Sequence, residues 1–378
     1  MAVVMRILGG SWLRAGTVVG VVIVSVAVVA AVLLAAVGAS PTQVATGLYT
    51  GAFGSRVNAA ITVTDAVPLV LVALGWIVTL RAGRIHIGFP GQIIIGGVFA
   101  SAVALEVPGL PGVVELPTAL LAGFVGGGLY AGIAAYLWAR RGVQEIVSTL
   151  LLNLIAAEVV AWVVRGPLRE ATGGQPQSNP FPHSSIWPAV PGIAYGSLSW
   201  DIVLIPVATA ATVFVLRRTT IGFRLRLVGA NPIAARCAGY RPKQVGIAAI
   251  VVSGGLAGLA GACLLLAGQT PVLTDGFESG TGFNGIAVAL LALNSPLGVI
   301  PSALLFSGLA TGSDAVQVTL NVPSSIATIL QGLVILVVLV AATIMSRRQK
   351  TARGPALEFA EAHPGEFAAV GPVTAGER

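Results

Sequence analysis

The sequence is poor in charged residues and in cysteine. Only 9% of its 378 residues are charged, whereas 56% are hydrophobic. Water-soluble domains carry about 25% charged residues, so this chain lacks the polar side chains needed to cover an aqueous globule. Its two cysteines, Cys237 and Cys263, lie roughly 39 Å apart if the sequence between them is helical, far beyond the reach of a disulfide. The composition therefore predicts an integral membrane protein without disulfides.

Motifs for nucleotide, metal and acyl-transfer chemistry are also missing. The chain has two lysines, Lys243 and Lys350, and neither follows the glycine-rich loop that a P-loop requires. No zinc-binding spacing and no Gly-x-Ser-x-Gly sequence occur. The net charge of +7 does not indicate nucleic acid, because the cations gather at the ends of apolar runs. We expect no cofactor on this chain, so that ATP and Mg²⁺, if used, bind to another polypeptide.

Long apolar runs fill most of the sequence. About 20 apolar residues cross the hydrocarbon core of a bilayer as a helix. The chain offers ten candidate runs, at residues 17–39, 66–80, 91–107, 117–139, 145–164, 200–216, 245–268, 281–294, 297–314 and 325–345. We predict an all-α, polytopic membrane helix bundle of about ten transmembrane helices, occupying residues 17–346. Runs 66–80 and 281–294 are short, which suggests tilted, broken or re-entrant helices.

Positive charges lie at alternate ends of these runs. The clusters are Arg6 with Arg14, Arg81 with Arg84, Arg140 with Arg141, the cations of 217–244, and Arg347 with Arg348 and Lys350. With ten spans, all of these clusters fall on one side, which the positive-inside rule makes cytoplasmic. Arg56, Arg165 and Arg169 are exceptions on the other side.

This orientation places both termini in the cytoplasm. They comprise residues 1–16 and the tail 347–378, which is predicted to be disordered because it is rich in Ala, Gly, Pro and Glu and lacks periodicity. The longest extracytoplasmic loop is then 165–199, which is rich in Pro, Gly and Ser.

The loop 217–244 carries seven cations and no Asp or Glu. Within it, residues 229–239 are predicted to form one short helix: Asn231 can cap it, Pro232 suits its first position, and Gly239 can end it in the left-handed conformation. A helix of about seven residues is not stable alone in water, so it needs a partner surface. The alternative is that the loop is basic only because cytoplasmic loops usually are.

Four polar residues within the runs are candidates for a transport pathway: Gln92, Asn153, Glu158 and Asn284. A polar group facing hydrocarbon is costly, so each should face a neighbouring helix or a wet pathway. For Gln92 and Asn153 the alternative is a structural hydrogen bond between helices. For Glu158 it is a side chain that reaches the membrane interface.

Glycines recur at four-residue spacing and predict close helix packing. The pairs are Gly123 with Gly127, Gly128 with Gly132, and Gly254 with Gly258.

Four passages, in order, resemble a known family. They are Arg81 to Gln92, Gly142 to Asn153 with Gly166 to Leu168, Thr219 to Arg236, and Gly282 to Gly298. They resemble the permease subunits of bacterial ABC importers of the branched-chain amino acid and simple-sugar group, most closely the longer permease of lipoprotein-dependent nucleoside importers. The first passage departs from the family pattern at His86, where Asn is usual, and at Pro90, where Glu is usual.

The resemblance implies an ABC importer permease fold in the bacterial cell membrane. It implies a second permease, ABC ATPase subunits and an extracytoplasmic substrate-binding lipoprotein as partners, and a nucleoside as cargo. The residues expected to couple to the ATPase are Gly229, Ala230, Asn231, Pro232, Ala234, Ala235, Arg236 and Gly239. Alternatives that remain open are a sugar or branched-chain amino acid permease, an ion-coupled secondary transporter, and a structural subunit without a pathway.

Overall fold

The computed structural model describes residues 40–107, 111–171, 174–192, 198–267 and 271–320, with a few single positions outside these ranges. The chain divides into two compact units. Residues 31–332 form one unit, which contains every helix discussed below, and residues 1–30 with 333–378 form the other. The predicted span 17–39, most of 325–345, and both predicted cytoplasmic termini lie outside the described residues.

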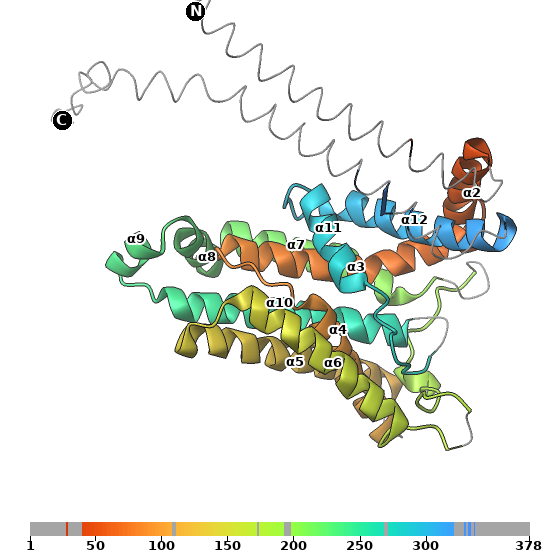
Figure 1. Ribbon diagram of the computed structural model, residues 1–378, viewed down its shortest axis with the longest axis horizontal. Helices are drawn as coiled ribbons and strands as arrows, with labels where there is room; N and C mark the ends of the chain where they lie inside the picture. The colour runs from red at the N-terminus through yellow and green to blue at the C-terminus, as the bar shows by residue number, and fades with distance from the viewer. Residues whose placement is uncertain are drawn as a thin grey trace, which may run out of the picture. The chain divides into compact units, whose positions relative to one another are not determined.

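The described part of the chain is a bundle of helices (Figure 1), with only isolated β-bridges besides. The helices are α2 (Pro41–Phe53), α3 (Arg56–Arg81), α4 (Phe89–Glu106), α5 (Gly112–Tyr136), α6 (Glu145–Arg165), α7 (Leu204–Arg218), α8 (Thr220–Ala230), α9 (Pro232–Cys237), α10 (Pro242–Leu266), α11 (Thr281–Leu291) and α12 (Val299–Leu320). A π-helical turn, Leu137–Arg141, extends α5, and a 3₁₀ turn, Trp200–Val203, precedes α7. The predicted all-α fold is confirmed.

Seven helical segments of the described residues are long and apolar enough to cross a membrane, and α11 is a shorter apolar helix. They correspond to eight of the ten predicted spans. The short span predicted at 281–294 is confirmed, since α11 has 11 residues. The span predicted at 66–80 is confirmed, but its predicted short length is wrong, because α3 has 26 residues and begins at Arg56.

The first half of α3 escaped prediction because it is polar. Its side chains are satisfied by α2, a helix that the hydropathy pattern did not indicate: Thr62 donates to the Ala52 carbonyl at 3.0 Å, and Asn58 donates to the Thr50 carbonyl at 3.1 Å. Contacts that are remote from the local hydropathy pattern therefore set where α3 starts.

The helices α3, α4, α5 and α10 make the packed centre of the bundle. Glycines allow α5 and α10 to touch through their backbones. A Cβ atom added at Gly258 would lie 2.1 Å from the Gly123 carbonyl oxygen, and one added at Gly127 would lie 2.3 Å from the Gly254 carbonyl oxygen. The predicted close packing of these four glycines is confirmed.

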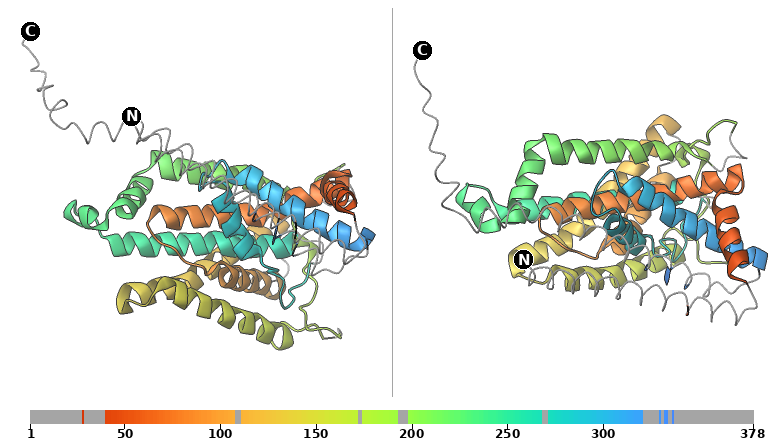
Figure 2. Two further views of the ribbon diagram at one scale, coloured as in Figure 1. Left: turned by 45° about the horizontal axis from the view of Figure 1, so that its top comes forward. Right: turned by 90° about the horizontal axis from the view of Figure 1, so that it is seen from above.

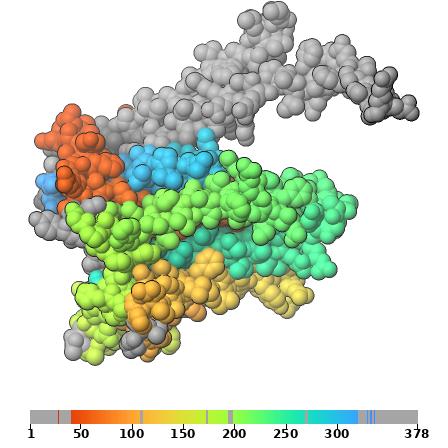
Figure 3. Space-filling model, turned by 180° about the vertical axis from the view of Figure 1, so that it is seen from behind, coloured from red at the N-terminus to blue at the C-terminus, as the bar shows by residue number. Residues whose placement is uncertain are grey.

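One end of the bundle carries α8, α9 and the cations Arg81, Arg140 and Arg141; we call it the basic end. Figure 2 shows α8 turning away from the end of α7, with α9 beyond it at the tip. From behind, α7 lies along one face of the molecule beside α10 (Figure 3). The described parts of the long segment 166–199 lie at the opposite end, where Ser178 and Trp187 donate backbone hydrogen bonds to Leu273 and Leu266.

Two connections in the bundle turn back into its interior. After α3 ends at the basic end, residues 82–88 return between the helices, so that α4 begins beside Asn153 of α6 and Gly254 of α10. At about 1.5 Å per residue, Gly254 lies roughly 18 Å along α10, near its middle. After α10 ends at the opposite end, residues 271–280 lead inward to α11, whose Gly282 packs against Pro90. The first turns of α4 and α11 therefore meet inside the bundle.

We expect Gly127→Ala to destabilise the protein, because the new methyl group would overlap the backbone of α10, and overpacking of this kind costs about 1–3 kcal/mol. Gly132→Ala is the matched control on the same helix, because its Cβ would meet Val251 at an ordinary 3.7 Å. Thermal unfolding in detergent measures both. Equal melting temperatures would contradict backbone contact between α5 and α10.

Candidate functional site

The basic end presents a short capped helix. The Asn231 side chain accepts hydrogen bonds from the backbone N–H groups of Ile233 at 2.9 Å and Ala234 at 3.0 Å, and Pro232 occupies the first helical position. Gly239 follows the helix with φ of 83°. These features confirm the local structure predicted around Asn231, Pro232 and Gly239.

The predicted start of this helix, with Asn231 as cap and Pro232 as first residue, is confirmed. Grouping Gly229 and Ala230 with it was wrong, because they belong to the last turn of α8, a helix that the sequence did not indicate. The helix α9 itself has six residues. Thr219 caps α8 by accepting from the Gly222 N–H at 3.3 Å. The sequence signal for α8 was weak because arginines lie between its buried positions, Gly222, Leu225 and Val228, which are three residues apart.

The surface of α9 is exposed on all sides but one. Ile233 is 72% exposed, and Ala234, Arg236 and Cys237 are exposed as well. Ala235 is fully buried, and its carbonyl accepts from the Tyr240 N–H at 3.0 Å. Ala235 therefore anchors α9 to this protein, and its exposed neighbours are the ones available to a partner.

The end of α8 touches the connection that leads into the bundle. A Cβ atom at Gly229 would lie 2.3 Å from the Arg81 carbonyl oxygen and 3.0 Å from the Gly83 nitrogen. Gly83 itself has φ of 68°, a conformation that favours glycine. The backbone of α8 thus rests directly on the start of residues 82–88.

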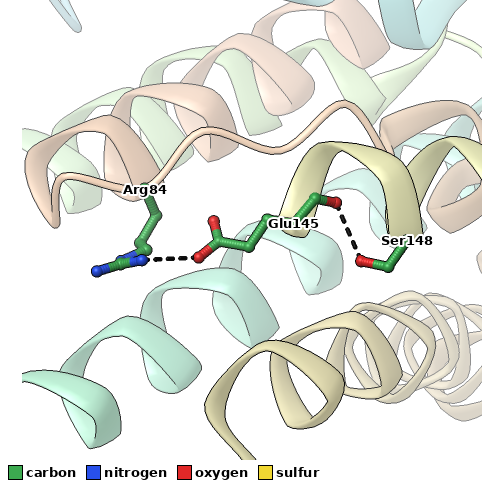
Figure 4. A network of polar contacts seen from close by, with 3 residues as sticks. All are labelled: Arg84, Glu145 and Ser148. Carbon is green, nitrogen blue, oxygen red and sulfur yellow. Dashed lines mark hydrogen bonds and ion pairs between the residues drawn. The ribbon is translucent and has the colours of Figure 1, made fainter. Parts of the chain in front are cut away.

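An ion pair joins residues 82–88 to the start of α6. Arg84 donates to the Glu145 carboxylate at 2.9 Å, while Ser148 donates to the Glu145 carbonyl at 3.1 Å (Figure 4). The Arg84 guanidinium also lies 3.9 Å from the centre of the Trp138 ring. Because the Glu145 side chain is only 8% exposed, this pair is shielded from water more than a surface ion pair is.

His86, two residues beyond Arg84, is fully buried, and neighbouring helices satisfy polar groups of this stretch. The His86 ring stacks on Phe89 with ring centres 4.5 Å apart, and its Nε2 lies 3.3 Å from the Ser253 hydroxyl of α10. The Ile87 N–H donates to the Thr149 hydroxyl of α6 at 3.2 Å. His86 thus contacts both α4 and α10.

Asn153 completes the first turn of α4 from a different helix. Its Oδ1 accepts from the Gly91 N–H at 2.9 Å, and its Nδ2 donates to the Ile87 carbonyl at 2.8 Å. The first N–H groups of a helix have no partner within the helix, so this side chain acts as a cap supplied by α6. The geometry thus shows a structural hydrogen bond between helices for Asn153, which was one of the two interpretations of this residue. Its role in a transport pathway stays a prediction.

Gln92 and Asn284 occupy equivalent positions in the two interior helix starts, each the fourth residue of its helix. Gln92 is 1% exposed, and among the described residues its Oε1 has no hydrogen-bond partner. Asn284 is half-buried. The two helices touch at Gly282 and Pro90, so the structure brings these two predicted residues toward one region.

The start of α11 is capped by a residue that the sequence did not suggest. Glu278 accepts from the Gly282 N–H at 2.6 Å and from the Gly280 N–H at 3.0 Å. A carboxylate at a helix N-terminus is favoured by both hydrogen bonding and the helix dipole. Glu278 lies two residues before Gly280, in a short segment between two apolar runs. Nothing in this local sequence indicates the capping role.

Glu158 lies apart from the other three candidates. It is exposed, on a face of α6 whose large apolar side chains are exposed too, with Leu154 at 67% and Trp162 at 66%. It projects from a different side of α6 than Asn153, five residues earlier. The structure therefore does not group Glu158 with Gln92, Asn153 and Asn284.

Comparison of the sequence with known proteins gives a family match over residues 58–341. The family is described as "Branched-chain amino acid transport system / permease component". The chain belongs to this family. The resemblance inferred from its four passages is thereby confirmed.

Two relatives illustrate the range of this family. The permease is 34% identical to the glucose ABC transporter permease protein TsgB13 of Haloferax volcanii over 334 residues, covering 86% of this chain and 87% of the relative. It is 32% identical to the guanosine ABC transporter permease protein NupP of Bacillus subtilis over 294 residues, covering 77% and 83%. No solved structure matches. The protein is thus an ABC transporter permease, a transport component rather than an enzyme.

We expect Asn153→Leu to lower the melting temperature of the permease. The substitution leaves the Gly91 N–H and the Ile87 carbonyl without partners, and each unpaired buried group costs about 1–3 kcal/mol. Leu154→Ala is the control, because Leu154 lies on the exposed face of the same turn. An unchanged melting temperature for Asn153→Leu in purified permease would contradict the capping role.

Proposed function

We propose that this permease is one half of the membrane channel of an ABC importer for nucleosides, driven by separate ATPase subunits that bind α9. The observation that carries the proposal is the backbone contact of Gly229 with Arg81 and Gly83. This contact joins an exposed helix, suited to bind a partner, to the interior starts of α4 and α11. ATP and Mg²⁺ would bind to the ATPase subunits, and the basic end would face the cytoplasm of a bacterial cell.

The coupling step follows from rigid contacts. An ATPase that binds Ile233, Ala234 and Arg236 would move α9. Asn231 ends α8 and caps α9, so α8 would move with it. Because Gly229 leaves no space at the Arg81 carbonyl, a shift of α8 displaces residues 82–88. Those residues are bonded to α6 through Glu145 and Thr149, so α4 and α6 would move with them.

The substrate region would lie where the first turns of α4 and α11 meet. Broken helices near the middle of the membrane are the usual place for a transported solute in secondary transporters, because their ends offer free polar groups away from lipid. Gln92 and Asn284 supply amides, which both donate and accept hydrogen bonds. Such groups suit the hydroxyls of a ribose or a hexose and the edge of a nucleobase.

The exposed face of α6 would meet the second permease. Val147, Leu151, Leu154 and Trp162 form an apolar stripe at helical spacing, and Glu158 lies within it. A carboxylate facing lipid would be costly, whereas one in a wet pathway between two permeases is solvated. Glu158 would then lie beside the pathway, on a different surface from Gln92.

The nucleoside assignment rests on relatives, which include the guanosine permease NupP and the nucleoside ABC transporter permease protein NupB of Lactococcus lactis, 30% identical over 272 residues. The alternative is a sugar, favoured by the 34% identity to the glucose permease TsgB13. An extracytoplasmic lipoprotein would deliver either cargo.

Uptake of radiolabelled guanosine and glucose by proteoliposomes containing the complete transporter decides between them. Uptake driven by an ion gradient without any ATPase would reject both.

The docking of α9 can be measured through a native cysteine. Cys237 is exposed and Cys263 is buried, so a maleimide should label Cys237 selectively in the permease alone. We expect the ATPase subunits to slow this labelling about tenfold or more, since a docked surface excludes the reagent. Ile233→Asp should abolish the protection and reduce uptake, because it places a charge in the apolar centre of the contact.

The control for this measurement is Arg217→Gln, at an exposed position of the same basic segment outside α9. It should leave both the protection and the labelling of free permease unchanged. Full labelling of Cys237 in an assembled, active transporter would contradict the proposed docking.

Asn284→Leu tests the pathway. Among the described residues no hydrogen bond to the Asn284 side chain is seen, so its removal should leave the melting temperature unchanged. If the amide binds substrate, uptake should fall about tenfold, the effect of losing one hydrogen bond to a polar ligand. A fall in melting temperature with unchanged uptake per folded transporter would contradict the role.

A further inference from the structure

An apolar groove with a basic mouth runs between α7 and α10. It has a volume of about 860 Å³. Its walls are small or apolar side chains, among them Ala208, Ala211 and Val215 of α7 and Val245, Ala248 and Val252 of α10. In Figure 3 the two helices lie side by side on the visible face. The transport proposal makes no use of this groove.

The groove lies within the membrane-spanning part of the chain. The segments Trp200–Arg218 and Pro242–Leu266 are both candidate spans. The lining extends from Ala208 to Leu216 on α7 and from Gln244 to Leu256 on α10, which at 1.5 Å per residue is about 12 Å and about 18 Å. One leaflet of the hydrocarbon core is about 15 Å thick. The groove therefore matches the depth of a single lipid acyl chain.

The mouth of the groove is positively charged. Arg224 of α8 and Arg241, at the start of α10, line it together with Tyr240. The Arg224 guanidinium lies 5.8 Å from the centre of the Tyr240 ring. In the described part of the chain the ion pairs are Arg84 with Glu145 and Arg165 with Asp275, so neither mouth arginine is neutralised there. The whole segment 217–244 contains no acidic residue.

We propose that this groove binds one anionic phospholipid, with an acyl chain between α7 and α10 and its phosphate at Arg224 and Arg241. Basic pockets between membrane helices favour anionic headgroups, and each nearby cation strengthens the attraction. A water-soluble ATPase cannot reach the apolar part, which lies at membrane depth. A free anion would leave the apolar walls unfilled.

The bound lipid would touch the segment that joins α9 to α10. Gly239, Tyr240 and Arg241 all line the groove, and they form the return from α9 to the membrane. An occupied groove would hold this return against α7 and α8. The proposal requires only that α7 and α10 lie in the membrane, so it does not depend on the cargo or on the docking of α9.

The test uses the full chain, purified in a mild detergent and titrated with phosphatidylglycerol or with phosphatidylcholine of the same acyl chains. Native mass spectrometry counts the lipids bound to each chain. We expect one phosphatidylglycerol to bind in preference to phosphatidylcholine. The double variant Arg224→Gln with Arg241→Gln should weaken this binding about 25-fold, because each cation contributes a factor of about five.

Two further variants separate a built site from general attraction. Arg217→Gln with Arg218→Gln removes the same charge from the same segment, but neither residue lines the groove, so binding should change less than about twofold. Ala248→Phe fills the apolar wall without changing the charge and should also weaken phosphatidylglycerol binding.

Several results would overturn the proposal. They are equal affinity for the two lipids, equal weakening by both arginine pairs, and displacement of the lipid by inorganic phosphate at the same concentration, which would reveal an anion site only. Cross-linking of a probe at position 248 to a protein subunit in the assembled transporter would assign the groove to that subunit. The comparison of the two lipids and the phosphate competition use the unaltered chain, so they decide the question even if a variant fails to fold.

Discussion

Two helices of this permease begin inside the bundle, and the backbone N–H groups of their first turns must find partners without water. At α4 the partner is Asn153 of α6, which bonds to both Gly91 and Ile87. At α11 it is Glu278, immediately upstream in the chain. Irregular backbone is tolerated at membrane depth only where protein surrounds and satisfies it. The positions of Gln92 and Asn284 follow from these two helix starts.

Close backbone contact gives this interior its rigidity. In lipid the hydrophobic effect does not hold helices together, so van der Waals contact between backbones takes a larger share. Gly127 and Gly258 bring α5 against α10. The same kind of contact at Gly229 brings α8 against the end of α3, so a movement at the basic end meets no compressible side chain before it reaches residues 82–88.

The basic end combines three surfaces with different chemistry. The exposed face of α9 is partly apolar, with Ile233 at its tip. The Arg84 ion pair with Glu145 is turned inward and belongs to the helix packing. Arg224 and Arg241 face a groove between α7 and α10 instead. A count of positive charges does not distinguish these arginines. Arg84 forms a partly buried ion pair within the fold, whereas Arg224 and Arg241 line the groove.

The sequence by itself determined the all-α membrane fold, because a chain with 9% charged residues and repeated apolar runs has no other way to satisfy its backbone in lipid. It also determined the cap of α9, which depends on residues close together in the chain. The four-residue spacing of glycines indicated close helix packing, but the tertiary structure decided that α5 and α10 are the helices that meet there. Only the tertiary structure decided that α3 starts at Arg56, that Ala235 is buried, and that Asn153 caps another helix while Glu158 faces outward. Each of these depends on which distant helix lies alongside, and hydropathy and local spacing carry no information about that neighbour.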